Sequence, residues 1–405
     1  MKRSLLALAL LAVVRPACAA DWPNWLGPAH NGTSPEKGLL TDWPAGGPKL
    51  LWKVPGGDGY SSVAVVGQRA CTLVQRDGAE WVVALDTATG KEKWSKKIAP
   101  AYTNKFGNGP RSTPTIENGL IYVQSVKGPL VCLKVDDGSI VWQHDLLKEF
   151  GSENITWGLS ASPLIEGNLV LAVPGAKGAG VAAFDKKTGK LAWKVGDDGA
   201  AYASPIAVAV GGKRQIIFFT AEGLLAASPE GKELWRVPWL TEFKCNICTP
   251  LVVGDQLFVS SGEGVGCAMF RLSAGAAPEV VWDSKGSKGV MTNYWANSVE
   301  HNGYLYGLSG EFDKKIHLNC VDAKSGKLKW SQMDFGKGAI TLADGHLFIT
   351  TKKGDLVLVR ANPEKYEEKA RVGLLGENRT VPTIAEKRLY LRDRDSIYCL
   401  DIRGK

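Results

Sequence analysis

The chain lacks the signatures of several large classes of protein. Its five histidines lie far apart in the sequence without metal-ligand spacing, so no histidine metal centre is indicated. It has neither a phosphate loop of the Walker type nor a Gly-x-Ser-x-Gly elbow, the motifs of nucleotide hydrolysis and of serine hydrolases. After residue 20 no apolar run is long enough to span a bilayer, so we expect no membrane span.

Residues 1–20 have the pattern of a secretory signal peptide. Two basic residues precede an apolar run at residues 5–14, and small residues follow. Cys18 raises the alternative of a lipoprotein signal, but Arg15 and Pro16 stand where such a signal has an aliphatic residue. We therefore expect a chain exported to the periplasm or the extracellular space, without a lipid anchor.

The balance of charge is mildly basic. The full chain has 49 Lys and Arg against 41 Asp and Glu, a net charge of +8. Removal of residues 1–20 takes away three basic residues and no acidic ones, which leaves 46 − 41 = +5. These charges are spread through the predicted turns, which argues against a nucleic-acid-binding surface.

Cysteine usage does not indicate a disulfide framework. Eight cysteines minus Cys18 leave seven, an odd number. Cys245 and Cys248 form a single Cys-x-x-Cys pair. Thr249 follows where haem attachment requires His, and no second pair completes a zinc site, so either a local disulfide or two free thiols is expected.

A repeated phrase organises nearly the whole chain. Ala-x-Asp-x-x-Thr-Gly-x-x-x-Trp occurs at residues 84–94 and 183–193, and looser forms occur at 320–330 and 132–142. Alignment on the last residue gives Trp52, Trp94, Trp142, Trp193, Trp235, Trp282 and Trp330, with spacings by subtraction of 42, 48, 51, 42, 47 and 48. Such a period is typical of propeller blades with four short antiparallel strands.

The chemistry of the phrase supports this interpretation. The Asp86 side chain can accept hydrogen bonds from backbone amides ahead of it, and Gly90 supplies the positive φ of a tight hairpin. The next strand carries Trp94, whose indole is expected to dock on the neighbouring blade and to donate its N–H to a backbone acceptor. Cys132, Cys320 and Cys399 occupy the phrase's Ala position and are expected to be small buried residues.

Strand patterns predict an all-β fold, an eight-bladed propeller of four-stranded antiparallel blades over residues 50–405. Residues 380–405 end before any Trp strand, and residues 50–54 supply the missing strand, so the two chain ends share one blade. The seventh blade has Ala370 or Arg371 where the Trp is expected, and the fourth and fifth blades lack the Thr-Gly turn.

Residues 21–49 show no clear period and contain Trp22, Trp25 and Trp43 among Pro, Gly and Asn. We expect an irregular arm that packs onto blade loops at one face. The alternative is that these three indoles form a ligand platform.

The phrase resembles the tryptophan-docking motif of the quinoprotein-like propeller superfamily, which includes the pyrroloquinoline quinone dehydrogenases. Overall length, export signal and blade count are also similar to the propeller lipoproteins of the bacterial outer-membrane barrel-assembly machinery. The opening at residues 22–28 and the regions around Gly223, Thr249 and Arg392 resemble a group of exported quinone-repeat-like proteins. The motif docks blades and touches no substrate, so the resemblance implies the fold more strongly than an activity.

The superfamily's enzymes hold an acidic quinone in the axial funnel with a calcium ion and an Asp general base. Glu153 and Asn154 are the candidate calcium ligands here. The adjacent Cys-Cys of many such dehydrogenases and the haem-binding Cys-x-x-Cys-His are absent, and no Asp stands out as a base. We therefore assign no catalytic residue and expect no cofactor; pyrroloquinoline quinone and Ca²⁺ belong to the alternative of an alcohol or sugar dehydrogenase.

The favoured hypothesis is an exported, monomeric binding or scaffolding propeller that recognises an envelope protein or a small-molecule ligand at one face and the axial channel mouth. The loops expected to face the axis contain the candidate ligand-facing residues Asn108, Arg111, Trp157, Tyr202, Asn246, Asn293, Tyr294, Trp295 and Arg379.

Overall fold

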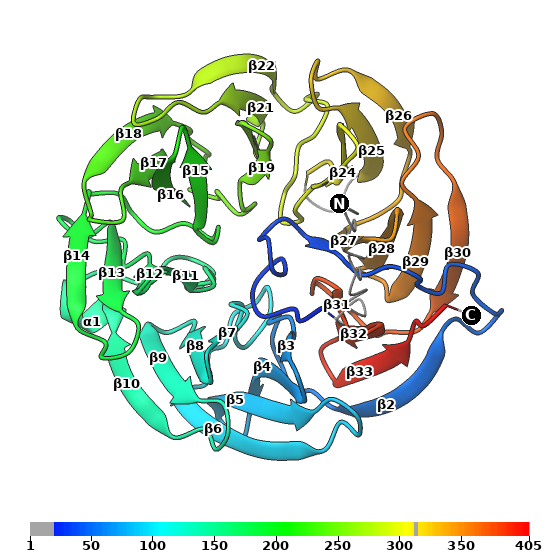
Figure 1. Cartoon of the computed structure of the whole chain (residues 1–405), viewed down its shortest axis with the longest axis horizontal. Coiled ribbons are helices and arrows are strands. Elements are labelled where there is room, and N and C mark those ends of the chain that lie inside the picture. Colours follow the sequence, from blue (N-terminus) through cyan, green and yellow to red (C-terminus); the bar gives the residue numbers. More distant parts are fainter. Residues whose placement is uncertain (1–19, 312–314, 405) are drawn as a thin grey trace, which may run out of the picture.

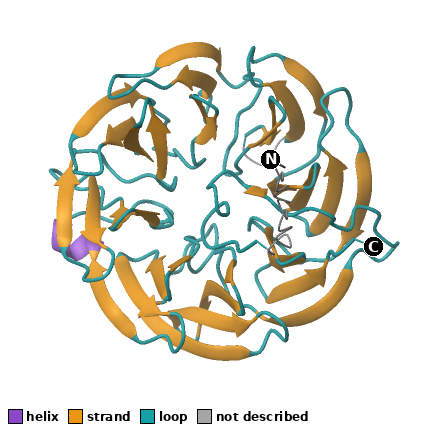
Figure 2. Ribbon diagram, viewed as in Figure 1, coloured by secondary structure: helices purple, strands orange, loops and turns teal. Residues whose placement is uncertain are grey.

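The chain is described from a computed structural model over residues 20–311 and 315–404. The predicted signal peptide, residues 1–20, lies outside the described residues except for Ala20. The described chain forms strands β1–β33 and one short helix, α1 (Leu146–Phe150), so it is almost entirely β (Figure 2). A search of the described residues for a helix with the length and apolarity of a bilayer crossing found none.

Eight four-stranded antiparallel sheets stand around a central axis, as the sequence predicted (Figure 1). The first four blades are β3 (Ala64–Val66), β4 (Arg69–Arg76), β5 (Ala79–Asp86), β6 (Glu92–Pro100); β7 (Thr115–Glu117), β8 (Leu120–Gln124), β9 (Pro129–Lys134), β10 (Ile140–Asp145); β11 (Leu164–Glu166), β12 (Leu169–Ala172), β13 (Val181–Asp185), β14 (Leu191–Val195); and β15 (Ile206–Val210), β16 (Lys213–Phe219), β17 (Gly223–Ala227), β18 (Glu233–Pro238).

The next three blades are β19 (Leu251–Val253), β20 (Gln256–Ser261), β21 (Gly266–Arg271), β22 (Glu279–Lys285); β23 (Val299–His301), β24 (Tyr304–Ser309), β25 (His317–Asp322), β26 (Leu328–Gln332); and β27 (Gly338–Ala343), β28 (His346–Thr351), β29 (Asp355–Arg360), β30 (Glu368–Gly373). The eighth blade consists of β31 (Thr383–Ala385), β32 (Arg388–Arg392), β33 (Ser396–Asp401) and β2 (Lys49–Pro55), and β1 (Thr33–Ser34) is added inside the seventh blade. In the first seven blades the strands follow one another in chain order from the innermost to the outermost, whereas in the eighth blade the outermost strand is β2 from the other end of the chain.

The two ends of the chain close the ring, which confirms the predicted shared blade. β2 pairs antiparallel with β33 and forms the outermost strand of the eighth blade. Arg392 at the end of β32 fixes this blade to the first: its buried guanidinium donates to the carbonyl oxygens of Ser61 at 3.1 Å and Asp58 at 3.0 Å. Without β2, strand β33 would have one unpaired edge, so the pairing of the two chain ends completes the eighth blade.

A β-bulge precedes the docking position in every outer strand. In β6 the register shifts so that Trp94 lies opposite Ala84 while Glu92 lies opposite Leu85. The same shift occurs in the other seven outer strands, and the residue opposite the docking Trp is Cys132, Ala183, Ala226, Met269, Cys320 or Cys399 in the remaining Trp-bearing blades. The bulge re-aims the side chain that follows it, which here is the indole.

Each indole packs on the hairpin turn of the next blade. Trp94 lies against Gly138 so closely that a Cβ on Gly138 would approach the ring at 2.5 Å. The Trp94 Nε1 also donates to the carbonyl oxygen of Val135 at 3.0 Å. Equivalent bonds of 2.8–3.1 Å join Trp52 to Thr87, Trp142 to Lys186, Trp193 to Pro229, Trp282 to Ala323 and Trp330 to Asn362. At Gly138 the glycine is therefore required for close approach of the ring as well as for its positive φ, whereas the turn that receives Trp330 contains no glycine.

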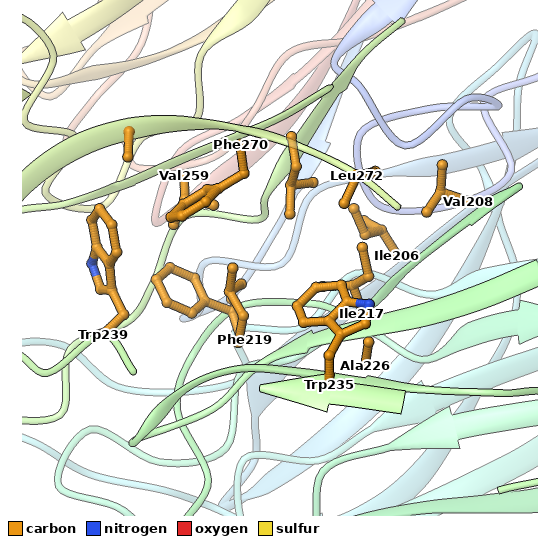
Figure 3. Packing of buried hydrophobic residues seen from close by; sticks show 14 residues of the cluster. Ile206, Val208, Ile217, Phe219, Ala226, Trp235, Trp239, Val259, Phe270 and Leu272 are labelled. Atoms are coloured by element: carbon orange, nitrogen blue, oxygen red, sulfur yellow. The ribbon is translucent and has the colours of Figure 1, made fainter. Parts of the chain in front are cut away.

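Two blades depart from this docking. Trp235 donates to Gln215 of its own blade and not to a turn of the next blade. The fourth and fifth blades are held instead by a large apolar cluster, in which Phe219 and Ile217 face Phe270 and Val259 (Figure 3).

The seventh blade has Ala370 in β30 opposite Leu358, at the position of the docking Trp. The two outer strands of the eighth blade come from opposite chain ends and share no turn, so no turn glycine is there to receive an indole. Trp43 of the N-terminal segment packs into the cluster between these blades, with its ring centroid 6.1 Å from that of Phe348.

Candidate functional site

The antiparallel order of the strands gives the propeller two distinct faces. Within each of the first seven blades the turn between the first and second strands and the turn between the third and fourth strands lie at one end. The connection to the next blade and the turn between the second and third strands lie at the other end. We call the end with the interblade connections the loop face and the opposite end the turn face.

The N-terminal segment crosses the axis at the turn face. Trp22 exchanges two backbone hydrogen bonds of 2.8 Å with Val65 of the first blade, and β1 then pairs in parallel with the end of β27 in the seventh blade. Figure 1 shows this dark blue segment over the centre of the ring. Its Trp25 reaches inward and donates from Nε1 to Thr249 at 2.9 Å. The segment therefore lies over one end of the channel.

An axial cavity of about 600 Å³ lies between this segment and the loop face. Its lining consists of Trp25, Tyr60, Phe106, Arg111, Trp157, Ser160, Tyr202, Ser204, Phe243, Cys245, Ile247, Thr249, Tyr294, Trp295, Asn297, Lys337, Lys352 and Arg379. All but two of these come from the interblade connections; Trp25 belongs to the N-terminal segment and Lys352 to the turn after β28. A volume of this size is within the range of ligand pockets.

The lining combines aromatic rings with cations. Eight of the lining residues are Trp, Tyr or Phe and four are Arg or Lys, and none of the described lining residues is Asp or Glu. Arg111 lies over the rings of Tyr102 at 4.8 Å and Tyr60 at 5.6 Å, and Arg379 lies over Tyr60 at 5.0 Å. Lys337 is 5.0 Å from the ring of Tyr294. The cavity therefore offers flat apolar contact together with positive charge.

A chain of hydroxyl acceptors joins the starts of neighbouring innermost strands, and one of them, Ser204, lines the cavity. The Ser62 N–H donates to the Thr113 Oγ1 at 3.2 Å, the Thr113 N–H to the Ser162 Oγ at 2.8 Å, and the Ser162 N–H to the Ser204 Oγ at 2.9 Å. Each bond joins the start of one innermost strand to the equivalent position in the next blade. This explains why a hydroxyl residue precedes Pro at these starts: the hydroxyl accepts a bond from the neighbouring blade, and Pro has no N–H to leave unpaired.

Six of the nine predicted ligand-facing residues lie in the lining: Arg111, Trp157, Tyr202, Tyr294, Trp295 and Arg379. The three asparagines do not. Asn246 and Asn293 are buried and hydrogen-bonded to backbone carbonyl groups, Asn246 to Thr220 at 2.8 Å and Asn293 to Leu308 at 3.0 Å. The Asn108 amide donates to the Asp58 carboxylate at 3.3 Å. These three side chains hold the loops in place.

Several residues of the lining were not predicted from the sequence. Tyr60, Phe106, Phe243, Lys337 and Lys352 were not among the candidates, although they lie in the same class of connection or turn. Their shared position in a connection that leads to an innermost strand, or in the turn after a second strand, is the pattern that identifies them. Trp25 was considered only as part of a possible platform, and it is the N-terminal tryptophan that lines the cavity.

The calcium site of a quinone enzyme does not fit these residues. Calcium prefers carboxylate and amide oxygen ligands, and the described lining contains no carboxylate. The Asn154 amide is already used, since it donates to Val126 at 2.9 Å and accepts from the Leu159 N–H at 3.2 Å. Glu153 is exposed next to it, and the described residues contain no cluster of three or more His, Cys, Asp or Glu that could hold a metal ion.

Buried titratable groups lie close to the cavity. Cys245 and Cys248 are free thiols in the structure, and burial raises the pKa of both, which leaves them as poor nucleophiles. Burial also lowers the pKa of the Arg111 guanidinium. Glu80, which is fully buried, accepts from the Ser125 hydroxyl at 2.5 Å, and burial raises the pKa of this carboxyl to about 7.

Comparison with known proteins identifies relatives of this chain. The model of the family described as outer membrane protein assembly factor BamB matches residues 48–303 and 314–403. The BamB of Moranella endobia is 27% identical over 294 residues, which cover 69% of this chain and 72% of that protein.

Solved structures share the fold at low identity. The structure of BamB from Moraxella catarrhalis has a TM-score of 0.61 at 14% identity and covers 87% of this chain and 99% of its own. A quinohemoprotein alcohol dehydrogenase from Comamonas testosteroni has a TM-score of 0.64 at 13% identity, covering 95% of this chain and 81% of its own. These two likenesses concern the fold alone.

Proposed function

The chain belongs to the family described as outer membrane protein assembly factor BamB, and from this membership we propose that it is a non-catalytic scaffold that docks an envelope protein on its loop face during outer-membrane protein assembly. Residues 1–20 would act as a signal peptide that directs the chain to the periplasm. Residues 21–49 would act as an arm on a single propeller domain.

The observation that carries the proposal is a set of exposed apolar side chains in the interblade connections, two of which line the axial cavity. Phe106, Leu240 and Phe243 lie in interblade connections with exposed fractions of 51%, 68% and 53%. Phe106 and Phe243 also line the cavity. Large apolar side chains that gather at the mouth of a cavity are typical of a protein interaction site. We call these three residues the apolar rim.

A second candidate function is a quinone oxidoreductase that uses pyrroloquinoline quinone and Ca²⁺. The aromatic and cationic lining favours it, because a planar acidic quinone would stack on the rings and pair with Arg or Lys. The absence of carboxylates from the described lining argues against it, since both a calcium site and an Asp base require them. We therefore prefer the scaffold function.

The test is genetic complementation in the source bacterium. A strain that lacks the protein is expected to have reduced levels of outer-membrane β-barrel proteins, and the wild-type chain is expected to restore them. Phe243→Glu should fail to restore them at equal protein abundance, because it places a charge on the docking surface. Val280→Glu is the matched control: Val280 is 57% exposed but lies on the outer strand β22. Restoration to wild-type levels by Phe243→Glu would contradict the proposal.

A further inference from the structure

Positive charge is concentrated in the axial cavity, and none of the described lining residues carries a carboxylate. Arg111, Lys337, Lys352 and Arg379 share a space of about 600 Å³. Two of these cations, Arg111 and Arg379, both lie over the ring of Tyr60, so their like charges repel one another at short range. An anionic group beside this pair of guanidinium groups would relieve the repulsion, so this part of the lining favours a negatively charged occupant.

The two arginines are held by backbone acceptors that are fixed in the loops. Arg111 donates to the carbonyl oxygens of Gly109 and, at 2.8 Å, Gly107. Arg379 donates to the Phe106 carbonyl oxygen at 3.1 Å and to the Glu377 carboxylate at 3.3 Å, while its buried Nε has no hydrogen-bond partner. Because Arg379 bonds to the backbone of the rim residue Phe106, the cationic and apolar parts of the site form one surface.

The apolar rim distinguishes a protein segment from a free small anion. A small molecule in the cavity would leave Leu240, which is 68% exposed and is not among the lining residues, without an apolar contact. A protruding loop with an acidic tip and apolar residues on either side would fill the cavity and cover the rim together. Its charge and shape would match both parts of the surface.

We propose that the axial cavity receives an acidic loop of the partner protein, whose Asp or Glu carboxylates meet Arg111 and Arg379 while flanking apolar side chains cover the apolar rim. This inference rests on the proposed function, because it names the chemistry of the partner that docks on the loop face. Trp25 forms part of the cavity lining on the side of the turn face and limits how far the loop can enter.

The experiment selects a ligand without assuming its identity. A phage-displayed library of random disulfide-constrained heptapeptides is panned against the purified protein, and recovered peptides are measured by calorimetry at low and high salt. We expect peptides with one or more acidic residues beside aromatic or aliphatic ones, and affinity that falls as salt increases. Recovery of no peptide above background, or of peptides without acidic residues, would overturn the proposal.

Variants locate the binding. Arg111→Gln with Arg379→Gln should weaken the selected peptides at least tenfold, and Arg379→Gln alone should weaken them severalfold if the double variant does not fold. Lys91→Gln with Lys190→Gln is the matched control, because both lysines are exposed on the turn face. Equal affinity of wild type and the arginine variants would overturn the proposal.

A small aromatic dianion provides the competing outcome. If naphthalene-2,6-dicarboxylate binds the wild-type cavity more tightly than every selected peptide, the cavity is a small-molecule site and the proposal is wrong. Failure here is distinguishable from failure of the proposed function. Docking without loop insertion would leave complementation sensitive to Phe243→Glu but insensitive to Arg379→Gln.

Discussion

The substitution Gly138→Ala tests how neighbouring blades are joined. Gly138 has φ of +70°, and a Cβ at this position would lie 2.5 Å from the Trp94 ring. Gly119 in the same blade has φ of +78°, and a Cβ there would meet no atom within 4 Å, so it isolates the backbone cost alone. The pair therefore separates the strain of a left-handed conformation from the clash with the indole.

The expected costs follow from these two effects. An L-residue in the left-handed region costs roughly 1–2 kcal/mol, which is the whole expected effect of Gly119→Ala. Gly138→Ala adds an overpacking cost of about 1–3 kcal/mol, so its total should reach roughly 2–5 kcal/mol. Trp94→Ala removes the ring and its bond to Val135, and should cost about 3–5 kcal/mol.

The assay is urea unfolding of the single variants and of the Trp94→Ala Gly138→Ala double variant. With the ring gone the clash disappears, so the double variant should be about 1–3 kcal/mol more stable than the sum of the single costs predicts. Equal costs for Gly119→Ala and Gly138→Ala, or additive costs in the double variant, would refute the proposed docking.

Three further predictions concern closure, pH and cofactor chemistry. Deletion of residues 396–405 removes β33 and the pairing with β2, so circular dichroism should show an unfolded chain; a folded monomer would contradict closure. The pKa of Glu80 is raised from 4.5 to about 7, so the folded state binds the extra proton, and its contribution to stability is full below pH 4.5 and lost as pH rises to 7. One pH unit corresponds to about 1.4 kcal/mol, so the free energy of unfolding of Glu80→Gln minus that of wild type, measured in urea, should rise by about 3 kcal/mol between pH 4.5 and pH 8. If this difference does not change with pH, Glu80 does not titrate in this way. Pyrroloquinoline quinone with Ca²⁺ should give no dye-coupled oxidation of alcohols or sugars, whereas turnover would establish the oxidoreductase alternative.

The fold could be predicted because the repeated residues are the ones that pack neighbouring blades against each other. A residue pair such as Trp94 and Gly138 is fixed by contact across two blades, so both recur once in most blades, at spacings between Trp residues of 42 to 51. The Ala370 exception also has a local cause, since the eighth blade has no turn to receive an indole. The path of residues 21–49 was less accessible, because Trp22 and Trp43 are positioned by contacts with blades far away in sequence.

The candidate site was predictable only in part, for a physical reason. Aromatic and cationic residues in the interblade connections, such as Trp157 and Arg111, line the cavity. Asn246 occupies a similar connection, but its amide is needed by backbone carbonyl groups inside the fold. Sequence position identifies a loop at the axis, whereas the direction of each side chain depends on which backbone groups lack another partner.

The docking role of the loop face is tested most directly by photo-crosslinking in living cells. A photoreactive phenylalanine analogue is placed at Phe243 on the apolar rim or at Val280 on β22, which have similar exposed fractions of 53% and 57%. We expect position 243 to give a discrete adduct with an envelope protein and position 280 to give none. An adduct from position 280 with none from position 243 would contradict the docking role.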